Sequence, residues 1–126
     1  MEQKYLIDTN IIIAIFSKTL PDDAKKFVAN LSPIISAVTY IETLGWHKAT
    51  NEQLAPLKDF MSKATILPID HLVIEKTILI RQQKKIGLGD AIIAATSLVH
   101  HFNLLTRNTS DFKNITGLNV VNPYSL

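Results

Sequence analysis

The sequence predicts one α/β domain, residues 1–126, built around a mainly parallel sheet that helices cover on both faces. Two observations lead to this prediction. Short apolar runs typical of buried strands alternate with longer segments of helical periodicity, and the connections between them are short. No internal repeat or low-complexity tract divides the 126 residues, which suit a single compact domain.

The composition is that of an ordinary globular protein, with 47% hydrophobic and 19% charged residues. A net charge of +2 at pH 7 does not by itself indicate a nucleic-acid binder. The absence of cysteine excludes disulfides and a thiolate zinc site. Polar residues 8–10 interrupt the apolar stretch near the N-terminus, so it resembles neither a signal peptide nor a membrane span, and we expect a cytoplasmic protein.

Strand and helix alternate in the first part of the chain. Residues 4–7 form an apolar run that predicts a buried strand ending at Asp8, and the apolar residues 11–16 predict a helix after it. A second helix is expected over residues 21–30, because proline and two acids suit its first turn. Residues 34–36 then predict another short buried strand.

The middle of the chain predicts two helices and a strand. Residues 37–49 have the length and spacing of a mostly apolar helix with Glu42 in its middle. Residues 51–64 form an amphipathic pattern typical of a surface helix. A strand is expected at residues 65–69, where Pro68 indicates a strand end or a sheet edge.

The last part continues the alternation. Asp70 suits the N-cap of a helix that runs toward Lys85, and two glycines punctuate the chain after it. We expect Asp90 to open a helix of small residues over 90–102, with a short strand at 103–105 directly behind it.

The helix expected after Asp70 carries more apolar residues than one buried face needs. Its buried face is predicted to hold Leu72, Val73, Leu79, Ile80 and Ile86, with Ile74 and Ile78 nearly opposite and exposed. Exposed apolar residues of this kind indicate an oligomer or partner surface.

Three aspartates fall where α/β proteins place ligands, which is beyond the carboxyl ends of parallel strands. Asp8 follows the first strand, Asp90 opens a late helix, and Asp111 lies in the polar loop before a strand expected at 118–121. Helix N-capping is the ordinary alternative for Asp8 and Asp90.

Glu42 lies by helical spacing on a stripe with Val38, Thr39, Gly45 and Trp46, where a carboxylate is costly without a partner. No lysine or arginine lies within one turn on that stripe, so the partner is a distant cation, a hydrogen-bond network or a metal ion.

A hard cation such as Mg²⁺ or Mn²⁺ would bind these carboxylates and offset their mutual repulsion. A bound divalent cation makes phosphodiester hydrolysis feasible, because it lowers the pKa of water and stabilises charge on the phosphate. Basic residues either form a phosphate-binding rim or are simply solvated; these are Arg81, Lys84, Lys85, Arg107 and Lys113.

Four parts of the sequence together resemble the PIN-domain ribonucleases, and most of all the VapC toxins of type II toxin–antitoxin systems. They are LIDTN at 6–10, the helix that carries Glu42, LGDAIIAAT at 88–96 and LLTRNTSDF at 104–112. The resemblance covers essentially the whole chain. It implies a three-layer α/β/α fold with a central sheet of four or five short strands, and an Mg²⁺- or Mn²⁺-dependent endoribonuclease.

By this resemblance Asp8, Glu42 and Asp90 are the catalytic metal ligands. The family's fourth acid would fall at Asn108, which is a departure, so either Asp111 supplies the missing carboxylate or Asn108 contributes a neutral oxygen. We favour Asp111.

Polar neighbours of the acids are expected to orient the ligating carboxylates and waters, as in similar proteins. These neighbours are Thr9, Asn10 and Thr106. The resemblance further implies a homodimer and inhibition by a small antitoxin whose C-terminal segment fills the groove near the acids.

Other functions fit less well. A dehalogenase-type phosphatase needs a second Asp where this chain has Asn10, and a receiver domain needs a paired acid and a later lysine that are missing. The remaining alternative is a PIN-like scaffold that binds RNA or protein without cleaving.

Overall fold

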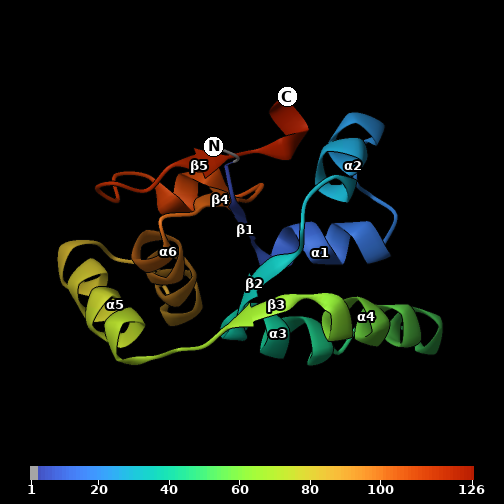
Figure 1. Ribbon diagram of the computed structural model, residues 1–126, viewed down its shortest axis with the longest axis horizontal. Coiled ribbons are helices and arrows are strands. Elements are labelled where there is room, and N and C mark those ends of the chain that lie inside the picture. The colour runs from blue at the N-terminus through green and yellow to red at the C-terminus, as the bar shows by residue number, and fades with distance from the viewer. Residues whose placement is uncertain (1–2) are drawn as a thin grey trace.

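The computed structural model describes residues 3–126 as a succession of short strands and helices (Figure 1). In chain order the elements are β1 (Tyr5–Ile7), α1 (Thr9–Phe16), α2 (Asp22–Ala29), β2 (Ile34–Ser36), α3 (Ala37–Leu44), α4 (Asn51–Lys63), β3 (Thr65–Leu67), α5 (His71–Gln83), α6 (Leu88–His100), β4 (Asn103–Leu105), the 3-10 helix η1 (Thr109–Phe112), β5 (Val120–Val121) and the 3-10 helix η2 (Pro123–Ser125).

All strand pairs of the described chain are parallel. β4 lies between β1 and β5 in one hydrogen-bonded set, and β2 pairs with β3 in another. β1 and β2 are in contact with each other, so the two sets continue one another across the molecule (Figure 1). The predicted α/β class with a mainly parallel sheet of four or five short strands is confirmed, although the five strands form one hydrogen-bonded set of three and another of two.

Neighbouring strand residues point to opposite faces, and this alternation builds the three layers. Ile7 and Leu105 belong to a core packed under α1, α2 and α4. Leu6 and Leu104, one residue earlier in each strand, belong to a second core packed under α5 and α6. The strands are therefore covered on both sides, as predicted.

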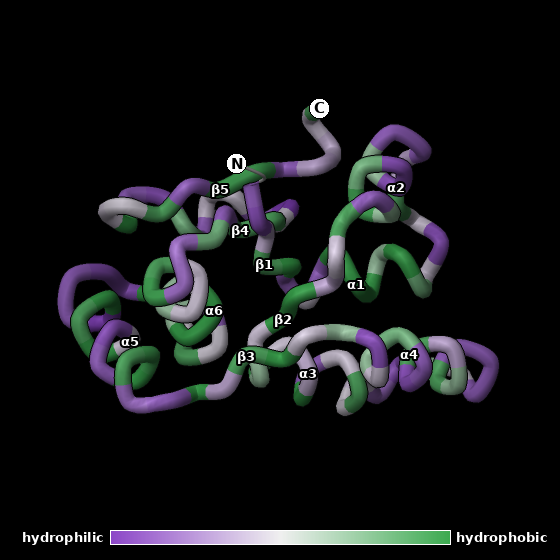
Figure 2. Tube along the Cα trace, viewed as in Figure 1, coloured by the Kyte–Doolittle hydropathy of each residue, from purple (hydrophilic) through white to green (hydrophobic). Residues whose placement is uncertain are grey.

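Hydropathy follows this layering (Figure 2). The trace is hydrophobic along β1, β2 and β3, whereas α2 and α4 alternate between hydrophobic and hydrophilic turns, as helices with one solvent face do. Across residues 3–126, no helix is long and apolar enough to cross a membrane.

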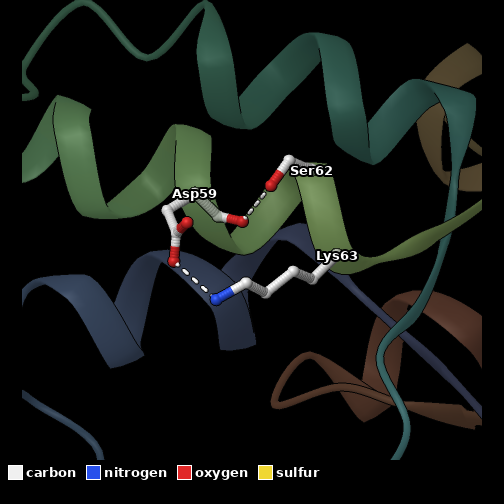
Figure 3. A network of polar contacts seen from close by, with 3 residues as sticks. All are labelled: Asp59, Ser62 and Lys63. Carbon is white, nitrogen blue, oxygen red and sulfur yellow. Dashed lines mark hydrogen bonds and ion pairs between the residues drawn. The ribbon is translucent and has the colours of Figure 1, made fainter.

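The exposed side of α4 carries a local polar network (Figure 3). Lys63 Nζ lies 3.1 Å from Asp59 Oδ2, and the Ser62 hydroxyl donates to the Asp59 carbonyl at 2.6 Å. Both side chains of the ion pair are mostly exposed, so the pair adds at most a few tenths of a kcal/mol. This network is solvated surface and has no part in the candidate site.

Two helices differ from the sequence prediction at their ends. The helix expected over 37–49 ends at Leu44, because the chain turns at Gly45, where a Cβ would lie 2.8 Å from the Ile41 carbonyl oxygen. The last helix begins at Leu88 with Gly87 as N-cap, two residues before Asp90. N-capping is therefore excluded as the role of Asp90.

The predicted buried face of α5 is partly wrong. Val73, Thr77 and Ile80 pack inward, while Leu72 and Leu79 are 62% and 50% exposed. Ile74 and Ile78 are exposed as predicted. The three buried residues follow one another at a spacing of four and then three, so they form a single narrow strip along α5. Exposed apolar residues flank this strip on both sides.

Candidate functional site

Parallel pairing brings the two strand ends at Asp8 and Thr106 together. Ile7 of β1 is paired with Leu105 of β4, so the next residue of each strand lies at the same edge. The Asp8 N–H donates to the Leu105 carbonyl at 2.9 Å and fixes this position. The site therefore forms where parallel sheets place ligands, at the carboxyl ends of their strands.

Asp8 is the N-cap of α1 and receives three hydrogen bonds. Thr9 N–H donates to Oδ1 at 2.7 Å, while Asn10 Nδ2 and Thr106 Oγ1 donate to Oδ2 at 3.0 and 2.8 Å. The Thr106 oxygen in turn accepts from the Asn108 N–H at 3.1 Å. The predicted supporting residues Thr9, Asn10 and Thr106 thus all contact the Asp8 carboxylate.

Burial dominates the electrostatics of Asp8, which is 4% exposed. Desolvation raises the pKa of its carboxyl from 3.8 to about 6; the hydrogen bonds from Thr106 and Thr9 oppose this rise, and the charges of Asp90 and Glu42 add to it. No lysine or arginine of residues 3–126 forms an ion pair with it.

Glu42 lies on α3 and its position corrects the sequence argument. The side chain is exposed, so it does not carry the burial cost that its apolar stripe suggested. Its partner is a hydroxyl, since Thr9 Oγ1 donates to Oε1 at 2.7 Å. The other oxygen, Oε2, faces the start of α6, where it lies 3.6 Å from the position of a Cβ on Gly89.

Asp90 lies in the first turn of α6, where the helix dipole favours a carboxylate. Partial burial raises the pKa of its carboxyl, and the charges of Asp111 and Glu42 raise it further. Asp111, in η1, is therefore close enough to act on Asp90. Asn108 contributes its backbone N–H to the site through Thr106.

The family model of the PIN domain matches residues 5–118, which include every one of these side chains. The chain belongs to the PIN-domain family.

Relatives of this PIN domain support the same assignment. Ribonuclease VapC1 of Rickettsia felis is 35% identical over 127 residues, covering 92% of this chain and 93% of that protein. A chain of a toxin–antitoxin complex from Klebsiella pneumoniae superposes with a TM-score of 0.80 at 36% identity, over 96% of this chain and 98% of its own. A chain of DNA-bound VapBC from Salmonella typhimurium superposes with a TM-score of 0.79 at 26% identity, over 97% of this chain and 99% of its own. The resemblance to the PIN domain and to VapC is therefore confirmed.

The oxygen atoms of these acids are the ligand type that a hard cation prefers, but the acids are not grouped closely enough to enclose one. Within residues 3–126, no three or more His, Asp or Glu side chains lie together tightly enough to enclose a metal ion. The carboxylates still act on one another, because Asp90 and Glu42 raise the pKa of Asp8. All donors are oxygens, as Mg²⁺ and Mn²⁺ prefer, and an uncompensated buried carboxylate is the group that such an ion would stabilise.

Arg107 is a basic residue whose backbone N–H reaches the polar neighbours of Asp8. It follows Thr106, its N–H donates to Asn10 Oδ1 at 3.2 Å, and its guanidinium lies 4.5 Å from the ring centroid of Tyr124. This cation–π contact holds the exposed arginine side chain against η2. Lys84 and Lys85 lie in the connection between α5 and α6, before the turn that leads to Asp90.

A cavity of about 620 Å³ opens at the opposite edge of the sheet, at the amino ends of β1, β2 and β3. Lys4, Tyr5, Asn30 and Thr65 are among its lining residues, and no carboxylate of residues 3–126 lines it. The cavity is therefore separate from the acids, which lie at the other ends of the strands.

Proposed function

We propose that this PIN domain is an endoribonuclease that hydrolyses RNA phosphodiester bonds with Mg²⁺ or Mn²⁺, and that it is the toxin of a VapBC-type toxin–antitoxin pair. The observation that carries the proposal is the state of Asp8, a buried carboxylate that accepts three hydrogen bonds and is acted on by the charges of two other acids. A relative that is 35% identical over 92% of the chain is named a ribonuclease.

Asp8, Glu42 and Asp90 are the proposed ligands of the cation. Asp8 is held in one orientation by its three donors, and Glu42 is held by the Thr9 hydroxyl, so two ligands are positioned before any ion arrives. When bound, the divalent cation lowers the pKa of a water molecule and offsets negative charge on the attacked phosphate.

Asp111 is the proposed fourth acid. Its charge acts on Asp90, which supports a position at the rim of the same site. Asp111 comes three residues after Asn108, which occupies the position of the family's fourth acid. The Asn108 backbone N–H donates to the Thr106 hydroxyl. We assign Asp111 a supporting role, either as a ligand or as the acceptor of a proton from the attacking water.

RNA is the proposed substrate, and Arg107 is the residue best placed to contact it. A guanidinium held on the Tyr124 ring neutralises a backbone phosphate at the edge of the acidic site. Lys84 and Lys85 lie in the α5–α6 connection, and we propose that they extend the contact along the RNA strand.

The proposed partners are a cognate antitoxin and a second copy of this chain. Matching chains belong to a toxin–antitoxin complex and to a DNA-bound VapBC assembly, which supports an antitoxin partner here. The exposed apolar residues of α5 support a homodimer, because neighbouring apolar side chains on the surface of a protein often mark a contact with another chain. Cytoplasmic residence follows from the same proposal, since RNA and antitoxin are encountered there.

A non-catalytic scaffold is the alternative function. It would keep the fold and bind RNA or protein without retaining acids at the strand ends. The retention of Asp8, Glu42 and Asp90, each held or perturbed by its neighbours, favours the nuclease.

The test is cleavage of total RNA by purified protein free of antitoxin, with Mn²⁺, with Mg²⁺ and with EDTA. We expect discrete fragments with the metals and none with EDTA. Asp90→Asn should reduce the rate by more than about a hundredfold, because loss of groups that merely support a ligand already costs roughly ten- to hundredfold.

Asp70→Asn is the matched control. Asp70 caps α5 by accepting from Val73 N–H, and asparagine caps equally well. This variant should cleave at the wild-type rate. Cleavage that persists in EDTA or in Asp90→Asn contradicts the proposed site, and intact RNA under every condition favours the scaffold.

A further inference from the structure

Thr39 is a fully buried residue in the first turn of α3, where the residue four positions earlier, Ile35, belongs to β2 and not to the helix. Three other buried helical threonines turn the hydroxyl back to the carbonyl four residues earlier, each at 2.7 Å; they are Thr43, Thr77 and Thr96. The Thr39 hydroxyl instead lies 3.0 Å from Thr9 Oγ1, 30 residues earlier in the chain.

The direction of this hydrogen bond follows from proton counting. A threonine hydroxyl has one proton to donate. Thr9 Oγ1 lies 2.7 Å from the Glu42 carboxylate, which cannot donate when ionised, so the Thr9 proton goes to Glu42. Thr39 must therefore donate to Thr9. The result is a directed chain from Thr39 through Thr9 to Glu42.

Glu42 needs such support more than Asp8 does. It is exposed on α3, and its long side chain loses considerable rotamer entropy when it is held in one conformation. Within residues 3–126, its carboxylate has one hydrogen-bond donor, the Thr9 hydroxyl, whereas the Asp8 carboxylate has three. A hydroxyl that is itself hydrogen-bonded is fixed in direction and is a stronger donor.

We propose that Thr39 is a positioning residue that acts through Thr9 to hold Glu42 ready for the divalent cation. The inference rests on the proposed function and extends it to a residue that touches neither cation nor RNA. In this arrangement a hydroxyl on the core side of α3 is linked through α1 to the carboxylate on the exposed side of α3.

Thr39→Val tests the proposal, because valine keeps the shape and removes the hydroxyl. Thr39→Ser keeps the hydroxyl and should restore function. Thr77→Val is the matched control, since it removes a buried helical hydroxyl that bonds within α5. Mn²⁺ affinity is measured by calorimetry and RNA cleavage is separated into kcat and KM for each variant.

We expect Thr39→Val to weaken Mn²⁺ binding by about tenfold and to lower kcat with little change in KM. Thr39→Ser should lie within about twofold of wild type, and Thr77→Val should bind Mn²⁺ as wild type does. Wild-type Mn²⁺ affinity in Thr39→Val, or an equal loss in Thr77→Val, would overturn the proposal.

A metal-free measurement separates this inference from the proposed function. Side-chain coupling constants from NMR report whether Glu42 occupies one χ1 rotamer. We expect one rotamer in the wild type and averaging in Thr39→Val, with EDTA present. If the wild type neither binds Mn²⁺ nor cuts RNA, the proposed function fails while this result still decides the role of Thr39; averaging in the wild type itself overturns that role.

Discussion

At the scale of single residues, Asp8 combines two properties that rarely coincide. Its carboxylate accepts three hydrogen bonds, which favour the ionised form, and it is buried, which favours the neutral form. Burial wins, since the pKa is raised to about 6. Within residues 3–126, no lysine or arginine forms an ion pair with this carboxylate. A bound divalent cation would supply the missing positive charge.

The pH dependence of stability follows from this shift. The pKa of Asp8 is about 6 in the folded protein against 3.8 for the free group, so between these values the folded state binds more protons than the unfolded state. In EDTA, Asp8 therefore adds stability as the pH falls from 7 toward 4, by about 3 kcal/mol in total, and this contribution is lost as the pH rises through 6.

Asp8→Asn should remove this dependence while keeping the N-cap. Chemical denaturation in EDTA at pH 7.5 and pH 5 measures it in both proteins. We expect the wild type to gain more stability than the variant on going to pH 5, and Mn²⁺ to stabilise the wild type alone at pH 7.5. Equal pH responses in the two proteins would contradict the raised pKa.

At the scale of elements, helix ends build the site, and the sequence predicts them unevenly. The junction of β1 and α1 at Asp8 is predictable, because an apolar run that stops at Asp leaves few choices. The start of α6 is not, because Gly87 and Gly89 permit several starting points, and the helix begins at Leu88. Hydroxyl partners such as that of Thr39 depend on packing between α1 and α3, which periodicity does not encode.

Gly89→Ala tests how closely α6 approaches Glu42. The added methyl would lie 3.6 Å from Glu42 Oε2 and 3.7 Å from Val38 Cγ1, which are ordinary contact distances. Because alanine favours the helix, we expect a gain of about 0.5 kcal/mol in folding free energy, measured by denaturation. The methyl also crowds the free carboxylate oxygen, so Mn²⁺ affinity should fall.

Gly87→Ala is the control, since its methyl would meet nothing within 4 Å. It should leave Mn²⁺ affinity unchanged. Unaltered affinity in Gly89→Ala would mean that the cation does not use the Glu42 oxygen that faces α6.

At the scale of the whole molecule, the three layers are predictable because alternation within β1 and β4 assigns consecutive residues to opposite cores. The outer surface is less so. Helical spacing assigns Leu72 and Leu79 to the buried face of α5, but both are exposed. The width of the buried strip of a helix depends on the shape of the element that packs against it. The spacing of apolar residues in the sequence carries no information on that shape.

The exposed residues of α5 predict a homodimer. Ile74 and Ile78 lie on one edge of the helix, four residues apart, and glutamate at both should disrupt an apolar contact there. Light scattering after size exclusion should give a dimer for the wild type and a monomer for the double variant, with unchanged circular dichroism. Gln83→Glu, which adds charge at an exposed position on the other side of α5 by helical spacing, should remain dimeric. A monomeric wild type at the highest attainable concentration contradicts the prediction.

The most direct measurement is anomalous diffraction from crystals of the protein grown with Mn²⁺. The account predicts an anomalous peak bounded by the carboxylates of Asp8, Glu42 and Asp90, with that peak absent from crystals of Asp8→Asn. Well-ordered crystals that bind Mn²⁺ elsewhere, or that show no peak at these acids while the same preparation cleaves RNA, would contradict the assignment of these residues as the metal site.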